Sequence, residues 1–211
     1  MSQLFITKAR LSFPHLVAPQ PNKNEPTKPG TYSADLILSE ASADWVAFMK
    51  HYATAIQERF KDQAPIVMNL IQAKTKLRCF GNGNEKINGK TGEVYSGYAG
   101  NMFISTKTSD YQQPQIINAL GQKIDNANAM LYRDLTSKMY AGCYVNAVIK
   151  PWIQDNEHGR AYRCELVALQ FAADGDPFGK PEVDVSSFFG AVAAAPASAP
   201  AMGLPPFMMA K

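Results

Sequence analysis

The sequence predicts a mainly β protein with one prominent amphipathic helix and a disordered C-terminal tail. Most of the chain is divided into short runs in which apolar and polar residues alternate, the pattern of half-buried strands. One run instead repeats its apolar residues at helical spacing, and the last part of the chain consists mostly of alanine and proline. At 211 residues, 46% of them hydrophobic, the chain is long enough for one good core plus appendages. We therefore expect one domain over residues 1–180 and a flexible tail over residues 181–211.

Two strands and a loop are expected first. Residues 4–13 alternate, and Pro14 is expected to end this strand because proline cannot donate a hydrogen bond to a sheet. Residues 18–30 contain four prolines and show no pattern for a core, which indicates a loop. Residues 31–38 alternate again and predict the second strand.

The clearest helix follows Ser42, whose hydroxyl can cap the first turn. Apolar residues from Trp45 to Phe60 recur at the i, i+3, i+4, i+7 spacing of a buried stripe. The helix is expected to end near Lys61. Its aromatic residues are interpreted as core, because rings at this spacing usually pack inside a protein.

Residues 74–80 predict a strand with an unusual face. Lys74, Lys76, Arg78 and Phe80 would project from the same side, because side chains alternate along a strand. Like charges at alternate positions repel, so an anionic partner such as a nucleic acid would stabilise them. The alternative is an edge strand whose lysines protect it against aggregation. The sequence leaves both interpretations open.

Residues 81–101 are rich in glycine and include the turn signal Asn88-Gly89. A nucleotide-binding loop is not expected, because neither of the common glycine motifs stands between a strand and a helix. Two interpretations remain, a long hairpin that folds over a polymer and plain turn chemistry.

A further strand, 101–107, again combines an aromatic ring and a cation on one face, which consists of Phe103, Ser105 and Lys107. Tyr111 follows in a polar loop. Residues 114–117 form a short extended piece, and residues 128–135 suggest a short helical turn.

Residues 140–171 predict a β-hairpin whose turn lies at 155–159. One face of its first strand is apolar and belongs in a core. The other face mixes aromatic, amide and cationic groups, a composition that suits base stacking and phosphate neutralisation. The alternative is an ordinary half-exposed strand whose tryptophan packs under a loop. The apolar face consists of Cys143, Val145, Ala147, Ile149 and Ile153, and the opposite face of Tyr144, Asn146, Lys150 and Trp152.

The cysteines and histidines give no sign of a metal site or a catalytic site. Three cysteines at wide spacing, with no CxxC pair, predict buried free thiols in a reducing compartment. The three histidines are isolated, and no hydrolase or two-metal nuclease motif occurs. No signal peptide is recognised, and no apolar run approaches the roughly 18 residues of a membrane helix. We expect no cofactor, no metal and no enzymatic activity, and a soluble protein in the cytoplasm.

Short strands, an intervening helix and repeated aromatic-plus-cation faces favour a five-stranded Greek-key barrel of the OB type, which binds single-stranded oligonucleotides. Rings would stack on bases of any identity, and cations would neutralise the backbone. The predicted stacking residues are Phe80, Phe103, Tyr111 and Trp152. The predicted phosphate contacts are Lys74, Lys76, Arg78, Lys107 and Lys150.

Four runs resemble a bacteriophage single-stranded DNA-binding protein family of the Enc34 type: residues 9–14, 97–105, 140–147 and 166–171. The resemblance spans roughly residues 4–175. It implies an OB fold, binding and protection of single-stranded DNA during phage replication or recombination in the cytoplasm of the infected bacterial host, and no catalysis.

Other functions remain as alternatives. A strand-annealing recombination protein would share the same surface, and a DNA-processing enzyme such as a nuclease or deaminase would belong to another class. A structural phage protein that binds only proteins is a third possibility. Short apolar segments of the tail, 184–189 and 204–209, are either contact sites for replication or recombination proteins or parts of a plain linker. Self-association on DNA is a further expectation.

Overall fold

The computed structural model describes residues 2–22, 27–109, 111–125, 127–157 and 159–179, and the chain up to Gly179 forms one compact unit. The predicted tail, 181–211, lies outside the described residues, so the expectations for it stay predictions.

Within the described part of the chain, seven strands form one sheet in the order β3-β4-β2-β1-β6-β7-β5. All neighbours are antiparallel except β5 and β7, which run parallel. The strands are β1 (Leu4–Gln20), β2 (Thr31–Leu38), β3 (Phe80–Asn82), β4 (Met102–Ser109), β5 (Gln115–Ile117), β6 (Tyr144–Asn156) and β7 (Gly159–Ala173). The helices are α1 (Ala43–Phe60), α2 (Ala64–Ala73) and α3 (Ala129–Ser137), and the 3-10 turns are η1 (Lys61–Gln63), η2 (Thr75–Leu77) and η3 (Gly83–Glu85).

The first strand is longer than predicted, because Pro14 does not end it. β1 continues to Gln20, and its pairing with β2 shifts register between Ser12 and His15. A proline is tolerated where the ladder is irregular, since no hydrogen bond is lost there. β1 pairs with β6 along its first part, Leu4 to Arg10, and with β2 from Arg10 to Gln20.

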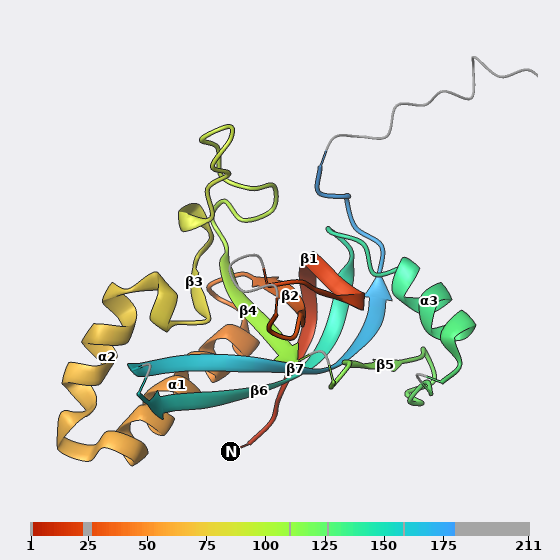
Figure 1. The fold of residues 1–211 in the computed structure, drawn as a ribbon. Coiled ribbons are helices and arrows are strands. Elements are labelled where there is room, and N and C mark those ends of the chain that lie inside the picture. The colour runs from red at the N-terminus through yellow and green to blue at the C-terminus, as the bar shows by residue number, and fades with distance from the viewer. Residues whose placement is uncertain (1, 23–26, 110, 126, 158, 180–211) are drawn as a thin grey trace, which may run out of the picture. The chain divides into compact units, whose positions relative to one another are not determined.

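The predicted helix is confirmed. Ser42 caps α1 through a hydrogen bond that its hydroxyl accepts from the backbone N–H of Trp45 at 3.2 Å. A second helix, α2, was not predicted, although Pro65 stands in its first turn and its buried residues follow helical spacing. Figure 1 shows α1 and α2 beside the tip of the β6–β7 hairpin and α3 at the other end of the sheet.

The predicted strand over residues 74–80 is wrong. The 3-10 turn η2 occupies residues 75–77, and only Phe80–Asn82 pairs with β4. Phe80 therefore does not share an open face with the lysines. Its ring is 5% exposed and lies in an aromatic core, with ring centroids 5.0 Å from Tyr52 and 5.7 Å from Phe48.

The hairpin is confirmed, with paired strands from Tyr144↔Ala173 to the last pair beside the turn, Asn156↔Gly159. The apolar face of β6 is buried as predicted except at Ile153, which is partly buried, and the opposite face is partly exposed. The three cysteines are free and buried, as expected. Burial raises the pKa of the Cys143 thiol to about 11, which keeps it protonated at neutral pH.

The strand pairing does not form the closed five-stranded barrel that the sequence predicts. β3 and β5 are additional short edge strands, and β5 extends the sheet beyond β7. The sheet nevertheless curves until β7 packs against β4, and one parallel bridge joins Arg78 to Tyr162 across the remaining gap. The observed fold is a mainly β, strongly curved sheet with one long helix.

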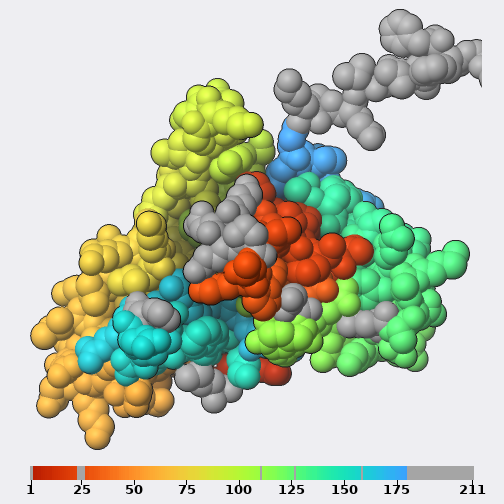
Figure 2. Space-filling model, viewed as in Figure 1, coloured from red at the N-terminus to blue at the C-terminus, as the bar shows by residue number. Residues whose placement is uncertain are grey.

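The segment between η3 and β4 projects from the rest of the unit, as Figures 1 and 2 show in yellow-green. Its base is fixed by backbone hydrogen bonds from Tyr95 to Lys86 and from Gly83 to Asn101. This is the glycine-rich loop of the sequence, and it forms one side of the candidate site. None of the helices in the described residues is long and apolar enough to span a membrane.

Candidate nucleic-acid interface

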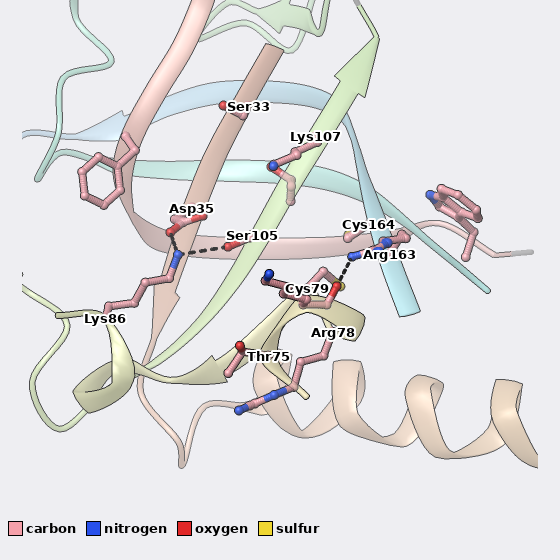
Figure 3. Close-up of a pocket in the computed structure, with 14 residues that line it drawn as sticks. Ser33, Asp35, Thr75, Arg78, Cys79, Lys86, Ser105, Lys107, Arg163 and Cys164 are labelled. Atoms are coloured by element: carbon pink, nitrogen blue, oxygen red, sulfur yellow. Dashed lines mark hydrogen bonds and ion pairs between the residues drawn. The ribbon is translucent and has the colours of Figure 1, made fainter. Parts of the chain in front are cut away.

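A groove of about 670 Å³ lies where β2 and β4 meet the β6–β7 hairpin and the segment around η2 (Figure 3). The elements that contribute to it are far apart in the sequence. Its lining consists of Phe13, Ser33, Asp35, Thr75, Lys76, Arg78, Cys79, Lys86, Ser105, Thr106, Lys107, Trp152, Arg163 and Cys164.

The floor of the groove comes largely from one face of β2 and β4. Antiparallel register places Ser33 opposite Lys107 and Asp35 opposite Ser105. The prediction that Phe103, Ser105 and Lys107 share a face follows from the same alternation and is confirmed for the two residues that line the groove. Small polar groups beside a cation leave room for a backbone and give it a positive surface.

The lining carries five cations and one acid. In the part of the chain that the structure describes, the side chains of Lys76 and Lys107 form no ion pair, and both are exposed. Arg163 is oriented by its hydrogen bonds to the backbone oxygen of Lys76 at 2.8 Å and to Gln154 at 3.2 Å. These three cations are available to an anion that enters the groove.

Lys86 is held across the floor by Asp35. Its Nζ lies 2.9 Å from Asp35 Oδ2, 3.4 Å from Ser105 Oγ and 4.4 Å from the centre of the Phe103 ring. Asp35 Oδ2 also accepts a hydrogen bond from the Tyr98 hydroxyl at 2.7 Å. Burial and the neighbouring carboxylate raise the pKa of Tyr98, so the hydroxyl stays protonated and continues to donate. The network fixes the projecting loop against the sheet.

Two partly exposed aromatic rings line the groove. Trp152 is 38% exposed on β6, and Phe13 is 42% exposed on β1. Phe13 has a φ of 46°, a left-handed conformation that is rare for a bulky residue, and it occurs at the β1 bulge. The Phe13 ring meets Tyr95 edge to face at 5.0 Å. Backbone strain of this kind is often found at binding sites.

The structure brings together four of the nine predicted site residues. Two of the rings predicted to stack on bases are buried. Phe103 is 8% exposed and lies beneath Lys86, so it supports the groove instead of presenting a free face, and Phe80 lies in the core. The residues that line the groove are Lys76, Arg78, Lys107 and Trp152.

Three predicted residues lie outside the groove lining. Lys74 is exposed beside η2, and Tyr111 is 85% exposed in the loop after β4. Lys150 lies two residues before Trp152 on β6 and approaches Glu165 at 3.9 Å. Because this distance is long and the Lys150 side chain is 45% exposed, the ion pair is weak and a phosphate can replace Glu165.

Sequence reasoning missed three lining residues that carry a positive charge or an aromatic ring. Arg163 pairs directly with Trp152 across the hairpin, so the hairpin register could have indicated it. Phe13 lies where the pairing of β1 with β2 shifts register, and such a bulge leaves no signal in the alternation of the sequence. Lys86 lies in a loop, where periodicity gives no direction.

Among the described residues, no group of three or more His, Cys, Asp or Glu side chains is arranged to hold a metal ion. The groove instead offers cations, hydroxyls and aromatic rings. Such a surface can bind a flexible polyanion that carries flat apolar groups.

Comparisons with known proteins point in the same direction. The model of the family described as "Enterobacter phage Enc34, ssDNA-binding protein" matches residues 2–196. "Putative protein p50" of Acyrthosiphon pisum secondary endosymbiont phage 1 is 27% identical over 179 residues, which cover 82% of this chain and 84% of that protein.

Solved structures support the fold. The single-stranded DNA-binding protein from bacteriophage Enc34, solved in complex with ssDNA, matches with a TM-score of 0.63 at 20% identity, covering 84% of this chain and 89% of that chain. Another structure of the Enc34 protein matches with a TM-score of 0.58 at 21% identity, covering 88% and 89%. Since the family model covers most of its length, this chain belongs to the family of the Enterobacter phage Enc34 ssDNA-binding protein.

Proposed function

We propose that this protein is a phage single-stranded DNA-binding protein, without enzymatic activity, that binds and protects the strand independently of its sequence. The strand runs through the groove, where bases stack on Trp152 and Phe13 and phosphates meet Lys76, Lys107 and Arg163. Stacking accepts every base because each has a flat face, and the cations release counterions from the backbone.

The observation that carries this proposal is the convergence of distant segments on one groove. β1, β2, β4, the η2 segment, the projecting loop and the hairpin together contribute two partly exposed rings and five cations. A duplex hides its bases, so exposed rings between cations are useful only to a strand whose bases are unpaired. Family membership supports the same ligand.

We further propose that the five longer strands represent an OB-type barrel. Their order, β4-β2-β1-β6-β7, and the packing of β7 against β4 are consistent with a five-stranded Greek key. β3 and β5 are then additions at the edges. This arrangement explains why the groove lies across β2 and β4.

Lys74, Tyr111 and Lys150 stay proposed contacts at the periphery, because each side chain is exposed but lies outside the groove lining. A strand that continues beyond the groove can reach such groups. Contacts of the tail with replication or recombination proteins and self-association on DNA stay predictions.

The test is a fluorescence titration with single-stranded and double-stranded oligonucleotides at about 50 mM and about 200 mM salt. We expect comparable binding of single strands of different base composition, weaker binding of duplex, and an affinity that falls steeply with salt. Equal affinity for duplex, or an affinity independent of salt, would contradict the proposal. Loss of labelled oligonucleotide during incubation with divalent metal would reveal a nuclease instead.

A further inference from the structure

Arg78 is held at the edge of the groove with one of its donors unsatisfied. The residue lies between η2 and β3, and its side chain is only 13% exposed. Nη1 donates to the backbone oxygen of Phe80 at 3.2 Å, and Nη2 donates to Glu85 Oε2 at 2.7 Å. Nε is buried without any hydrogen-bond partner, and it is the one such side-chain atom among the described residues.

An unsatisfied N–H on a buried cation is costly, so its persistence calls for an explanation. Nε and Nη2 lie on the same edge of the guanidinium group, the edge that can bind two oxygens of one carboxylate or phosphate. Glu85 makes a hydrogen bond to only one of these two donors. This edge of the Arg78 guanidinium group therefore has two donors for a bidentate anion, but only one of them is paired, with Glu85 Oε2.

Glu85 is suited to leave this position. It lies at the end of the 3-10 turn η3, and its side chain is 45% exposed. An exposed carboxylate recovers its hydration when it turns into solvent, and the phosphate that takes its place keeps the guanidinium group of Arg78 paired. The next residue, Lys86, remains anchored to Asp35 at 2.9 Å, so the loop need not move with Glu85.

We propose that Arg78 is a latent phosphate-binding site that Glu85 caps in the absence of DNA. A phosphodiester group of the bound strand displaces Glu85 and binds Nε and Nη2 together. This inference rests on the proposed function, because it assumes that the strand occupies the groove that Arg78 lines. It adds that a carboxylate of the protein competes with DNA for one defined cation.

Replacing Glu85 with glutamine tests the competition. E85Q keeps the shape of the side chain but removes the charge that a phosphate must displace. We expect affinity for oligo(dT) to rise by about fivefold, the equivalent of the larger values measured for exposed ion pairs. The plot of log affinity against log salt should steepen by up to about one unit, because one more cation becomes free to release a counterion.

E58Q is the matched control, since it makes the same change in net charge. Glu58 is exposed on α1 and is not part of the groove lining. We expect its affinity to stay close to that of the unchanged protein. If E58Q tightens binding as much as E85Q does, the effect is one of total charge and the cap is refuted.

The double variant decides whether Glu85 acts through Arg78. Lysine cannot bind an oxyanion in the bidentate manner, so R78K should weaken binding, and E85Q should bring little gain when R78K is present. An equal gain in both backgrounds would overturn the proposal. Circular dichroism is the check that each variant is folded. If R78K is unstable, the comparison of E85Q with E58Q still decides the question.

The capping of Arg78 and the binding of the strand in the groove can be refuted separately. If the unchanged protein binds oligo(dT) with the expected salt dependence but E85Q behaves identically, the cap is wrong and the groove remains. If the unchanged protein shows no binding at low salt, both proposals fail.

Discussion

Replacing Trp152 and Phe13 together with alanine is expected to weaken oligo(dT) binding by more than about tenfold, because stacking contributes about 1–3 kcal/mol per base. Both rings are partly exposed and line the groove, so each can take a base without rearrangement of the core. The loss should appear in fluorescence-anisotropy titrations at low salt. The salt dependence should change little, since no cation is removed.

Phe5→Ala is the control for this double variant. Phe5 lies on the same strand as Phe13. Its side chain is 59% exposed but does not line the groove. Its removal should leave binding unchanged. Unaltered binding by the Trp152/Phe13 variant, or an equal loss on replacing Phe5, would show that the bases stack elsewhere.

Phe80→Ala is expected to lower the free energy of unfolding by about 3–5 kcal/mol, the usual range for removal of a buried aromatic ring. The ring packs edge to face against Trp45, Phe48, Tyr52 and Tyr162, and its loss opens a cavity between α1 and the sheet. Urea denaturation followed by circular dichroism measures the change.

Trp152→Ala provides the comparison, because this ring is 38% exposed and should cost far less stability. We expect the two variants to differ in opposite ways: Phe80→Ala should lose stability, and Trp152→Ala should lose affinity for DNA. A stable Phe80→Ala variant with weakened DNA binding would restore the sequence-based interpretation of Phe80 as a stacking residue.

Elements with a long and regular pattern could be predicted from the sequence. The stripe from Trp45 to Phe60 gave α1, and the alternation on both sides of the turn gave the β6–β7 hairpin. The face shared by Ser105 and Lys107 followed from the same alternation. In each case the local pattern and the tertiary burial agree.

The segment 74–80 shows why the rest could not be predicted. Its alternation of cations suggests a strand, but α2 ends at Ala73 and the chain must turn before it can pair with β4. Tertiary packing then directs Phe80 into the core and leaves Lys76 in the groove. The contributions of Phe13 and Lys86 depend on a bulge and on a loop anchor, neither of which leaves a periodic signal.

Intrinsic tryptophan fluorescence tests the central claim most directly, because the chain has two tryptophans in contrasting positions. Trp45 is 6% exposed in the core, and Trp152 lines the groove. In a Trp45→Phe variant, titration with oligo(dT) should quench the remaining emission in a saturable manner, since a base stacks on Trp152. In a Trp152→Phe variant, the emission of Trp45 should be nearly insensitive to DNA. Saturable binding by gel shift with no quenching of Trp152, or equal quenching in both variants, would contradict a strand path through this groove.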